Sequence, residues 1–580
     1  MGLPEQEVPK FLNLLVSPNT ARADLRVVYV DSQQLEPKLD VWLHKSLSGI
    51  HTFDFNTDYV QKIRTHMKGG NSDLARMRDE ILSQMAWASI FEYQSRNTKI
   101  ESTLTLLRNT LKRLNLVVKP SDKGGRTVVM SDSYYRRACL NLLNVSTDYL
   151  TTTESAYWKC EATAKKLITI HKDALKLLLG AKEMAMRSRI FRVGYFYGLP
   201  KVHKSLEAPP MRPVVSQINH PTALFSAAIN KFTLKWILNE ESICQSSLDF
   251  TRTLDSLPRG AFKNVKFATI DVNSLYTSIP LATGIKRFYE YVEGKCRSRN
   301  DFEILNFIRK TLPFSQYNNV FLYGDTYYRQ KKGVAMGCPL GPTFANIYLL
   351  ELDRKIMELS KCCLYRRYID DIFIILPEEL VDFDTFESDL NKLDPDIKFK
   401  LEEFGSSVKF LDLDVFLDNG SVKYQLYEKE ISCIYRYVEK ESLHPPSTTI
   451  GIPLGAMKRI RNLTPNRLTS HLLFENIFLR RLANVGYNEV RMMDLWWKLI
   501  INPVVREHDS PDSHISAHER RIITPYVKSW KVNNMGIRRL NDLISKHPDK
   551  DMKKVTLTFS CNRSLKSKLV RSRYIASGSG

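Results

Sequence analysis

YRRYIDDIFIIL, at residues 365–376, and FATIDVNSLYTSIP, at residues 267–280, each place acidic residues beside apolar, β-forming runs. In the first stretch, the β-forming residues on both sides of Asp370 and Asp371 predict a hairpin with the two acids at its tip. In the second, alternation with a period of two predicts a strand that presents Asp271 at its C-terminal end. Two adjacent carboxylates repel each other, which favours a bound cation as the reason for keeping them together.

Carboxylates on two neighbouring strands are suited to hold a pair of divalent metals. Two metals about 3.5–4 Å apart can clamp the attacking and leaving oxygens of an in-line displacement, as in polymerases and nucleases. Taken alone, an Asp at this position more often caps the following turn, and a short YxDD match occurs by chance. The interpretation therefore depends on both acidic stretches together.

Composition narrows the class of partner. The chain of 580 residues is too long for one core and carries a formal net charge of +22. Such a basic excess favours a polyanionic partner. No apolar run approaches the length of a membrane-spanning helix and the N-terminus has no signal-peptide pattern, so we expect no membrane association. The nine cysteines form no CxxC pair, which indicates a reducing compartment.

A glycine-rich stretch, GVAMGCPLGPTFANIYLLELD at residues 333–353, predicts a loop followed by a helix that begins near Pro342. Glycine permits close approach of the backbone to a bulky ligand such as a base pair or nucleotide. Read alone, the stretch is also an ordinary junction between a loop and a helix.

Two basic, strand-like segments precede the acidic stretches: YGLPKVHKS at residues 197–205 and RPVVS at residues 212–216. They place Lys201 and Arg212 on neighbouring strands joined by a short loop. A guanidinium fork and a lysine point charge suit a triphosphate. Two solvated surface cations are the alternative for such a pair. Upstream, LVVKPSDKGGRTVVM at residues 116–130 predicts two short strands joined by a polar turn.

These blocks, in this order, resemble the reverse transcriptase family. Their residues are similar to those of the corresponding blocks in Penelope-like retroelements, which are related to the catalytic subunit of telomerase. The resemblance covers roughly residues 116–487 and includes FLDLDV at 410–415 and SLHPP at 442–446. It implies an α+β right-hand polymerase. The implied segments are a helical, RNA-binding N-terminal extension (1–115), fingers with part of the palm (116–265), a catalytic palm (266–425) with a finger insertion at about 285–332, a helical thumb (426–545) and a basic C-terminal tail or linker (546–580).

By the same resemblance, Asp271 and Asp370 would be catalytic and would ligate two Mg²⁺ ions, with Mn²⁺ as a possible substitute, and Asp371 would lie close by. The remaining implied residues are Val272, whose carbonyl adds a metal ligand, Lys201, Arg212, Tyr276, Met336 and Gly337 at the nucleotide, and Phe410, Leu411, Lys429 and His444 at the primer and template. Tyr276 falls at the position of the family's steric gate, where an aromatic ring selects deoxynucleotides.

The implied activity is RNA-directed DNA synthesis from a primer 3′-hydroxyl, with an RNA template, a DNA primer or nicked target DNA, and dNTPs as partners. Target-primed reverse transcription in the nucleus follows from the resemblance only. An RNA-dependent RNA polymerase and a catalytically inactive RNA-binding scaffold are the alternatives. Gly341 stands where this group often has Ser, and no GIY-YIG endonuclease motif occurs in these 580 residues. The sequence leaves open which RNA is the template, whether the target is a telomere or another site, and what the oligomeric state is. It also leaves open whether a C-terminal endonuclease was removed or is naturally absent.

Overall fold

The structure is a computed structural model of the whole chain. It describes residues 27–30, 51–52, 108–123, 127–144, 148–379, 383–428, 437–438, 440, 446–501, 519–525, 554–560 and 563–564. Helices and separate sheets alternate along the chain, which confirms the α+β class. Within these residues, no helix has the length and apolar character needed to cross a membrane.

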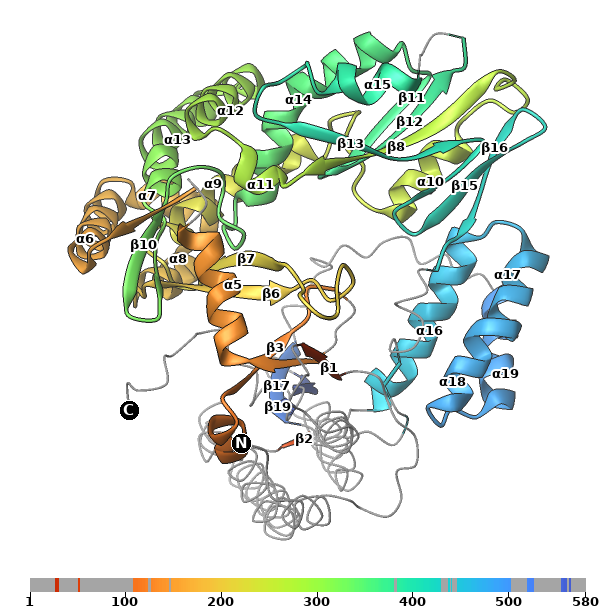
Figure 1. Cartoon of the computed structure of the whole chain (residues 1–580), viewed down its shortest axis with the longest axis horizontal. Coiled ribbons are helices and arrows are strands. Elements are labelled where there is room, and N and C mark those ends of the chain that lie inside the picture. The colour runs from red at the N-terminus through yellow and green to blue at the C-terminus, as the bar shows by residue number, and fades with distance from the viewer. Residues whose placement is uncertain are drawn as a thin grey trace, which may run out of the picture.

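A four-stranded antiparallel sheet, the palm sheet, carries both acidic stretches (Figure 1). Its strands, in spatial order, are β11 (Leu364–Tyr368), β12 (Asp371–Pro377), β8 (Val265–Asn273) and β13 (Lys398–Gly405). Strand β8 therefore lies between β12 and β13, and its register with β12 places Asp271 directly opposite Asp371. This one strand pairing brings together the two acidic stretches, which are far apart in the sequence.

The two faces of the palm sheet pack into two different hydrophobic cores. Ala268 and Ile270 of β8 belong to the larger core, which extends into the fingers. Phe267 of β8 and Phe373 of β12 belong to a second core that extends toward the C-terminal helices. The alternation expected for β8 is thus confirmed, and burial on both sides explains why Phe267, Ala268 and Ile270 are all apolar.

Helices cover the face that belongs to the larger core. Helix α14 (Gly341–Ser360) follows the glycine-rich stretch, with Pro342 in its first turn as the sequence predicts. Helix α12 (Leu281–Lys295) packs on it, and the Phe288 and Phe344 rings stack with centroids 5.8 Å apart. The other helices of this half are α5 (Asp132–Asn144), α6 (Glu154–Ile170), α7 (Lys172–Leu179), α8 (Ala181–Ser188), α9 (Ala223–Ile237), α11 (Leu275–Ser278), α13 (Arg299–Tyr317) and α15 (Phe383–Leu390). Helix α10 (Ser247–Asp255) instead packs into the second core through Phe250 and Leu254.

A five-stranded sheet, the finger sheet, lies on one side of the palm sheet (Figure 1). Its strands, in spatial order, are β5 (Tyr149–Thr152), β10 (Thr326–Gln330), β9 (Val320–Tyr323), β6 (Gly194–Pro200) and β7 (Met211–Ser216). Strands β9 and β10 come from the segment at about 285–332, so the chain returns to this sheet after it has formed β8. Beside it, β3 (Leu116–Pro120) and β4 (Thr127–Ser131) form the expected antiparallel hairpin, and β1 (Val27–Val30) pairs with β4.

On the other side of the palm sheet, a three-stranded sheet leads into a helical group (Figure 1). The sheet is β14 (Ser407–Phe410), β15 (Leu413–Asp418) and β16 (Ser421–Leu426). The helical group, called the thumb helices, is α16 (Pro446–Leu463), α17 (Arg467–Leu473), a π-helical segment η2 (Phe474–Leu479), α18 (Arg480–Asn484) and α19 (Glu489–Ile501). Trp496 is fully buried and stacks on Phe474, which joins α19 to η2.

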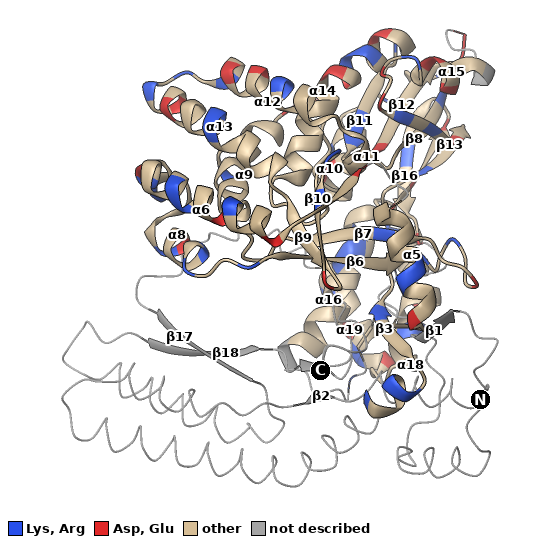
Figure 2. Cartoon of the chain, turned by 60° about the vertical axis from the view of Figure 1, so that its left-hand side comes forward, with Lys and Arg blue, Asp and Glu red and all other residues tan. Residues whose placement is uncertain are grey.

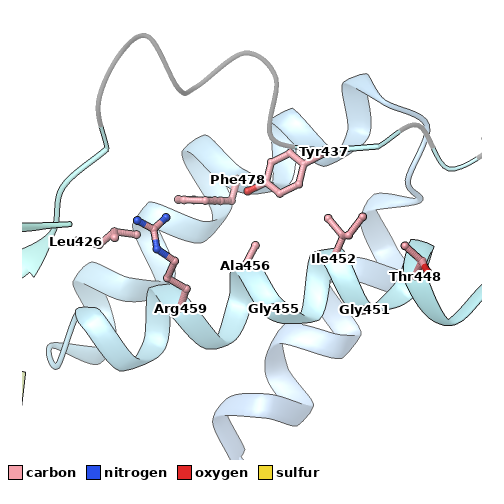
Figure 3. Close-up of a pocket in the computed structure, with 9 residues that line it drawn as sticks. All are labelled: Leu426, Tyr437, Thr448, Gly451, Ile452, Gly455, Ala456, Arg459 and Phe478. Carbon is pink, nitrogen blue, oxygen red and sulfur yellow. The ribbon is translucent and has the colours of Figure 1, made fainter. Parts of the chain in front are cut away.

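Small side chains on α16 leave a pocket beneath Phe478 and Tyr437 (Figure 3). Gly451 and Gly455 form its floor, and no atom lies within 4 Å of the position that a Cβ would take on either glycine. The pocket belongs to the thumb helices and does not include the acidic residues of the palm sheet.

The predicted N-terminal extension and C-terminal tail lie largely outside the described residues. What the structure does describe there is β1, β2 (His51–Thr52), a helix at 108–113, β18 (Lys554–Ser560) and β19 (Arg563–Ser564). Strand β17 (Glu519–Pro525) pairs in parallel with β18, and β19 pairs with β2. The domain limits proposed from the sequence therefore stay predictions.

Candidate active site

The β11–β12 hairpin brings Asp370 against the end of β8. Tyr368 pairs with Asp371, so the turn consists of Ile369 and Asp370, and Asp371 is the first residue of β12. This corrects the expectation that both acids lie at the tip, because the strand ladder continues through Asp371. The Val272 amide donates to the Asp370 carbonyl at 3.1 Å, which joins the turn to β8 directly.

The charges at this point act on one another. Burial raises the pKa of Asp271 above its usual value, and the negative charge of Asp370 raises it further. Glu402 on β13 adds to the same effect, whereas Lys123 and Lys204 oppose it. The structure therefore brings together Asp271 and Asp370, as the sequence predicts, and it adds a third carboxylate that sequence reasoning missed. Glu402 lies at an irregular step in the β13–β8 ladder, which period-two alternation cannot locate.

The donor set fits magnesium. Carboxylate and carbonyl oxygens are hard ligands, and Mg²⁺ commonly keeps several waters while it binds one or two carboxylates and the phosphates of a substrate. Asp271, Asp370 and the Val272 carbonyl could hold such an ion in this way. Among the residues that the structure describes, no group of three or more His, Cys, Asp or Glu side chains is arranged to hold a metal by itself. Substrate phosphates and water would have to complete the coordination.

Tyr276 lies between the acidic hairpin and the finger sheet. It belongs to the single-turn helix α11, which follows β8 after Ser274 has taken a left-handed conformation with φ 51°. Burial, followed by the charge of Asp370, raises the pKa of the Tyr276 hydroxyl to about 12, and Arg212 partly offsets the shift. The phenol thus interacts electrostatically with a carboxylate beside the palm sheet and with a cation of the finger sheet, and it stays neutral at physiological pH.

The glycine-rich loop is held closely between α11 and the finger sheet. Gly333 has φ 74°, and a Cβ on it would lie 2.4 Å from the Tyr276 carbonyl oxygen. Gly337 has φ 142°, and its Cβ would lie 2.2 Å from the Val215 carbonyl oxygen. The Val215 amide donates to the Met336 carbonyl at 3.2 Å. Both glycines are therefore required by close backbone contacts within the protein, whereas the sequence suggested close approach to a ligand.

A cluster of cations lies near the acidic hairpin, because Lys123 and Lys204 act on the charge of Asp271 and Arg212 acts on Tyr276. Figure 2 shows how Lys and Arg residues are distributed along the chain. Arg212 lies on β7, as predicted, whereas Lys201 directly follows the last residue of the adjacent strand β6 and does not lie on a strand. Burial lowers the pKa of Lys201, and the charges of Arg212 and Lys204 lower it further. Like charges held together in a partly buried place favour binding of an anion, because an anion relieves their mutual repulsion.

Asp122 is an anion beside these cations, and sequence reasoning treated it only as part of a turn. Its side chain is 5% exposed, and its Oδ1 lies 2.6 Å from Arg212 Nε. Its amide donates to the Pro200 carbonyl at 3.0 Å, which fixes the β3–β4 turn against the end of β6. The PSDK turn therefore supplies the counter-charge that holds Arg212 in place. No signal in the sequence separates this role from that of an ordinary polar turn.

Phe410 and Leu411 lie at the edge of the second core. Phe410 is buried against Phe250 and Phe373, with ring centroids 4.8 and 5.6 Å away. Leu411 has φ 54°, and the next residue, Asp412, makes an ion pair with Arg459 of α16 at 2.7 Å. Phe410 is thus a core residue, and the turn that follows it is tied to the thumb helices. Lys429 and His444 lie outside the described residues.

A family model and solved structures match this chain. Residues 209–402 match the family described as "Reverse transcriptase (RNA-dependent DNA polymerase)". The chain is similar to a solved telomerase from Candida albicans in complex with a TWJ fragment of telomeric RNA, with 12% identity, a TM-score of 0.45 and coverage of 88% of this chain and 81% of that one. For the Candida tropicalis telomerase in the same kind of complex, identity is 13%, the TM-score is 0.40 and coverage is 85% of each chain. No curated protein sequence matches.

The matched segment begins just before Arg212 and ends at Glu402, so it contains Asp271, Tyr276 and Asp370. It spans the palm sheet up to β13, the glycine-rich loop and strand β7 of the finger sheet. Residues 209–402 of this chain therefore carry its similarity to the reverse transcriptase family.

Proposed function

We propose that this protein is an RNA-directed DNA polymerase that adds deoxynucleotides to a primer 3′-hydroxyl on an RNA template. The observation that carries the proposal is the meeting of Asp271 and Asp370 across the Asp370–Val272 hydrogen bond, opposite a cluster of finger cations. This arrangement supplies carboxylates for metals on one side and cations for a triphosphate on the other.

Two magnesium ions held at Asp271 and Asp370 would lower the pKa of the primer hydroxyl and neutralise the leaving pyrophosphate. The side chains of this chain perform the positioning. Lys201 and Arg212 bind the triphosphate, Arg212 as a fork that Asp122 orients and Lys201 as a point charge. Electrostatic stabilisation and alignment are the main contributions that a protein makes to phosphoryl and nucleotidyl transfer.

Selection of the sugar is assigned to Tyr276. The ring lies close to the start of α14, since a Cβ on Gly341 would lie 3.4 Å from Tyr276 Cε1. A ring supported in this way cannot easily retreat from a ribose 2′-hydroxyl. This favours DNA synthesis over RNA synthesis.

We further propose a Penelope-like retroelement context, in which the primer is the 3′ end of nicked DNA and the reaction takes place in the nucleus. The resemblance of the sequence blocks supports this context. The net charge of +22 supports an extended contact with nucleic acid, and such contacts weaken steeply as salt rises.

The test is primer extension by the purified full chain on an RNA template with Mg²⁺, with dNTPs or NTPs, and with and without a nicked DNA duplex. We expect extension with dNTPs that Asp370→Asn abolishes. Asp325→Asn, an exposed residue in the β9–β10 turn, is the matched control and should extend normally. Extension with NTPs alone would indicate an RNA polymerase, and RNA binding without any extension would indicate a scaffold; either result contradicts the proposal.

A further inference from the structure

Arg367, on β11, is an arginine with no solvent exposure in the palm sheet. Its guanidinium makes a two-pronged ion pair with Asp353: Nε donates to Oδ1 at 2.7 Å and Nη2 to Oδ2 at 2.8 Å. Its Nη1 donates to Asn346 Oδ1 at 2.7 Å and to the Ile369 carbonyl at 3.0 Å. Every nitrogen of the fork therefore has a partner, although the side chain is far from water.

The bond to Ile369 reaches the turn that presents Asp370. Ile369 has φ 56°, a left-handed conformation that is a rare outlier for a β-branched residue. Strain of this kind persists only where the surroundings determine the backbone strongly, and it gathers at functional sites. The Arg367 guanidinium holds the carbonyl of the strained residue, and the Val272 amide holds the carbonyl of Asp370. The turn is thus fixed from two sides.

The other end of the network lies on α14, the helix that follows the glycine-rich loop. Asn346 and Asp353 are seven residues apart, which places them two turns apart on one face of the helix. Asp353 also accepts hydrogen bonds from Tyr365 at 2.7 Å and from Ser242 at 2.9 Å. These bonds and the ion pair compensate its buried charge. Arg367 therefore joins the acidic turn to the helix that carries the glycine-rich loop.

Stability alone does not account for this arrangement. A buried ion pair can often be replaced by well-packed apolar residues without loss of stability, because desolvation offsets the attraction. An apolar pair at these positions would fill the core but could not hold the Ile369 carbonyl.

We infer that Arg367 is a positioning residue, which fixes the Ile369–Asp370 turn against α14 so that the Asp370 carboxylate meets Asp271. The inference rests on the proposed function, because it concerns the alignment of a carboxylate that would bind the catalytic metal. Residues that orient metal ligands commonly change metal affinity or activity by about 10- to 100-fold when they are replaced.

The test uses Arg367→Lys in the full chain. Lysine keeps the charge beside Asp353, but its donors all lie on one atom and cannot reproduce the planar fork that also reaches Ile369. Two controls match it. Arg366→Lys changes the neighbouring residue, whose Nε donates to Thr253 on α10, and Ile356→Val loosens the buried face of α14 away from the turn.

The first readout needs no chemistry. Binding of a dNTP to a complex with a dideoxy-terminated primer is measured against Mg²⁺ concentration. We expect Arg367→Lys to raise the half-saturating Mg²⁺ concentration by about tenfold or more, with primer–template affinity unchanged. In a second readout, extension with a normal primer should slow by about 10- to 100-fold, well below the melting temperature of the variant. Both controls should behave as the wild type.

A wild-type Mg²⁺ dependence in Arg367→Lys, while the wild-type protein extends primers, would overturn the inference and leave the proposed function standing. The same loss in Ile356→Val would also overturn it, because the effect would then follow general loosening of α14. If Arg367→Lys does not fold, the double variant Arg367→Met with Asp353→Leu replaces the buried ion pair by apolar side chains that cannot hold the Ile369 carbonyl. It decides in the same way: a raised Mg²⁺ requirement supports the inference, and an unchanged one contradicts it. A wild-type protein without extension and without Mg²⁺-dependent dNTP binding would overturn both proposals.

Discussion

Replacement of Gly333 by alanine tests how the glycine-rich loop supports the active site. Gly333 has φ 74°, and an alanine Cβ would lie 2.4 Å from the Tyr276 carbonyl oxygen and 2.5 Å from Thr277 Cα. Both atoms belong to the backbone, so no side-chain rotation relieves the contact. The adjacent Val334 amide donates to the same Tyr276 carbonyl at 2.6 Å. Relief of the contact therefore requires the loop to move away from α11, which also lengthens this hydrogen bond.

The size of the effect follows from these distances. Ordinary contact begins at 3.4 Å, so the 2.4 Å approach must lengthen by about 1 Å. A misplacement of about 1 Å at an active site can cost about 100-fold in rate. The left-handed backbone of a non-glycine residue adds a cost of about 1–3 kcal/mol in stability. We therefore expect Gly333→Ala to slow primer extension by about 100-fold and to weaken discrimination between dNTPs and NTPs.

Single-turnover primer extension on an RNA template measures the rate, and Gly324→Ala is the matched control. Gly324 also has a positive φ, of 58°, but no atom lies within 4 Å of its Cβ position. The control should lose stability to a similar degree through its backbone and keep the extension rate. If Gly333→Ala extends primers as fast as Gly324→Ala, the close contact with Tyr276 does not govern the site and the reasoning is refuted.

Three further outcomes follow from the site. Tyr276→Ala should raise ribonucleotide incorporation at least about tenfold in a dNTP–NTP competition, whereas Tyr276→Phe should not, because the ring and not the hydroxyl excludes the ribose. Asp122→Asn should move the alkaline loss of dNTP affinity to lower pH, since the Asp122 charge supports protonated Lys201, whose pKa burial already lowers; an unchanged pH profile of KM would contradict this. Asp370→Asn should melt at a higher temperature than the wild type at pH 7 in chelator. The charge of Asp370 in the wild type helps to raise the folded-state pKa of Asp271, so the wild-type protein loses stability as pH rises through that pKa. The variant lacks this charge and loses less stability. Its higher melting temperature should disappear in acid, where Asp271 is protonated in both proteins.

Much of the fold was predictable because burial leaves clear periodic patterns. The alternation along β8 corresponds to two separate cores, and the apolar run of β12 corresponds to a strand buried on both faces. The start of α14 was predictable because proline is favoured in the first turn of a helix, where its missing N–H costs no helical hydrogen bond. The pairing of β10 with β5 and of β9 with β6 was harder to predict from the sequence, since it joins residues far apart in the chain.

Candidate site residues could be named from the sequence where the chemistry is concentrated in one side chain, as for Asp271, Asp370, Lys201 and Arg212, and their roles stay predictions. A residue could not be named where its role depends on a tertiary partner. Asp122 reads as a turn residue until its contact with Arg212 is seen. Arg367 reads as one of two adjacent strand arginines, and only the register places it inward while Arg366 faces α10. The left-handed conformation of Ile369 runs against its residue type, and no sequence rule for turns would select it.

The central claim is that Asp271 and Asp370 act as one metal-binding unit. The most direct measurement is a double-mutant cycle on the single-turnover rate of RNA-templated primer extension, with Asp271→Asn, Asp370→Asn and the double variant. Residues that act as a unit give strongly non-additive losses, so the double variant should be about as slow as either single variant. Losses that add independently, or near-normal extension by either single variant, would contradict the account.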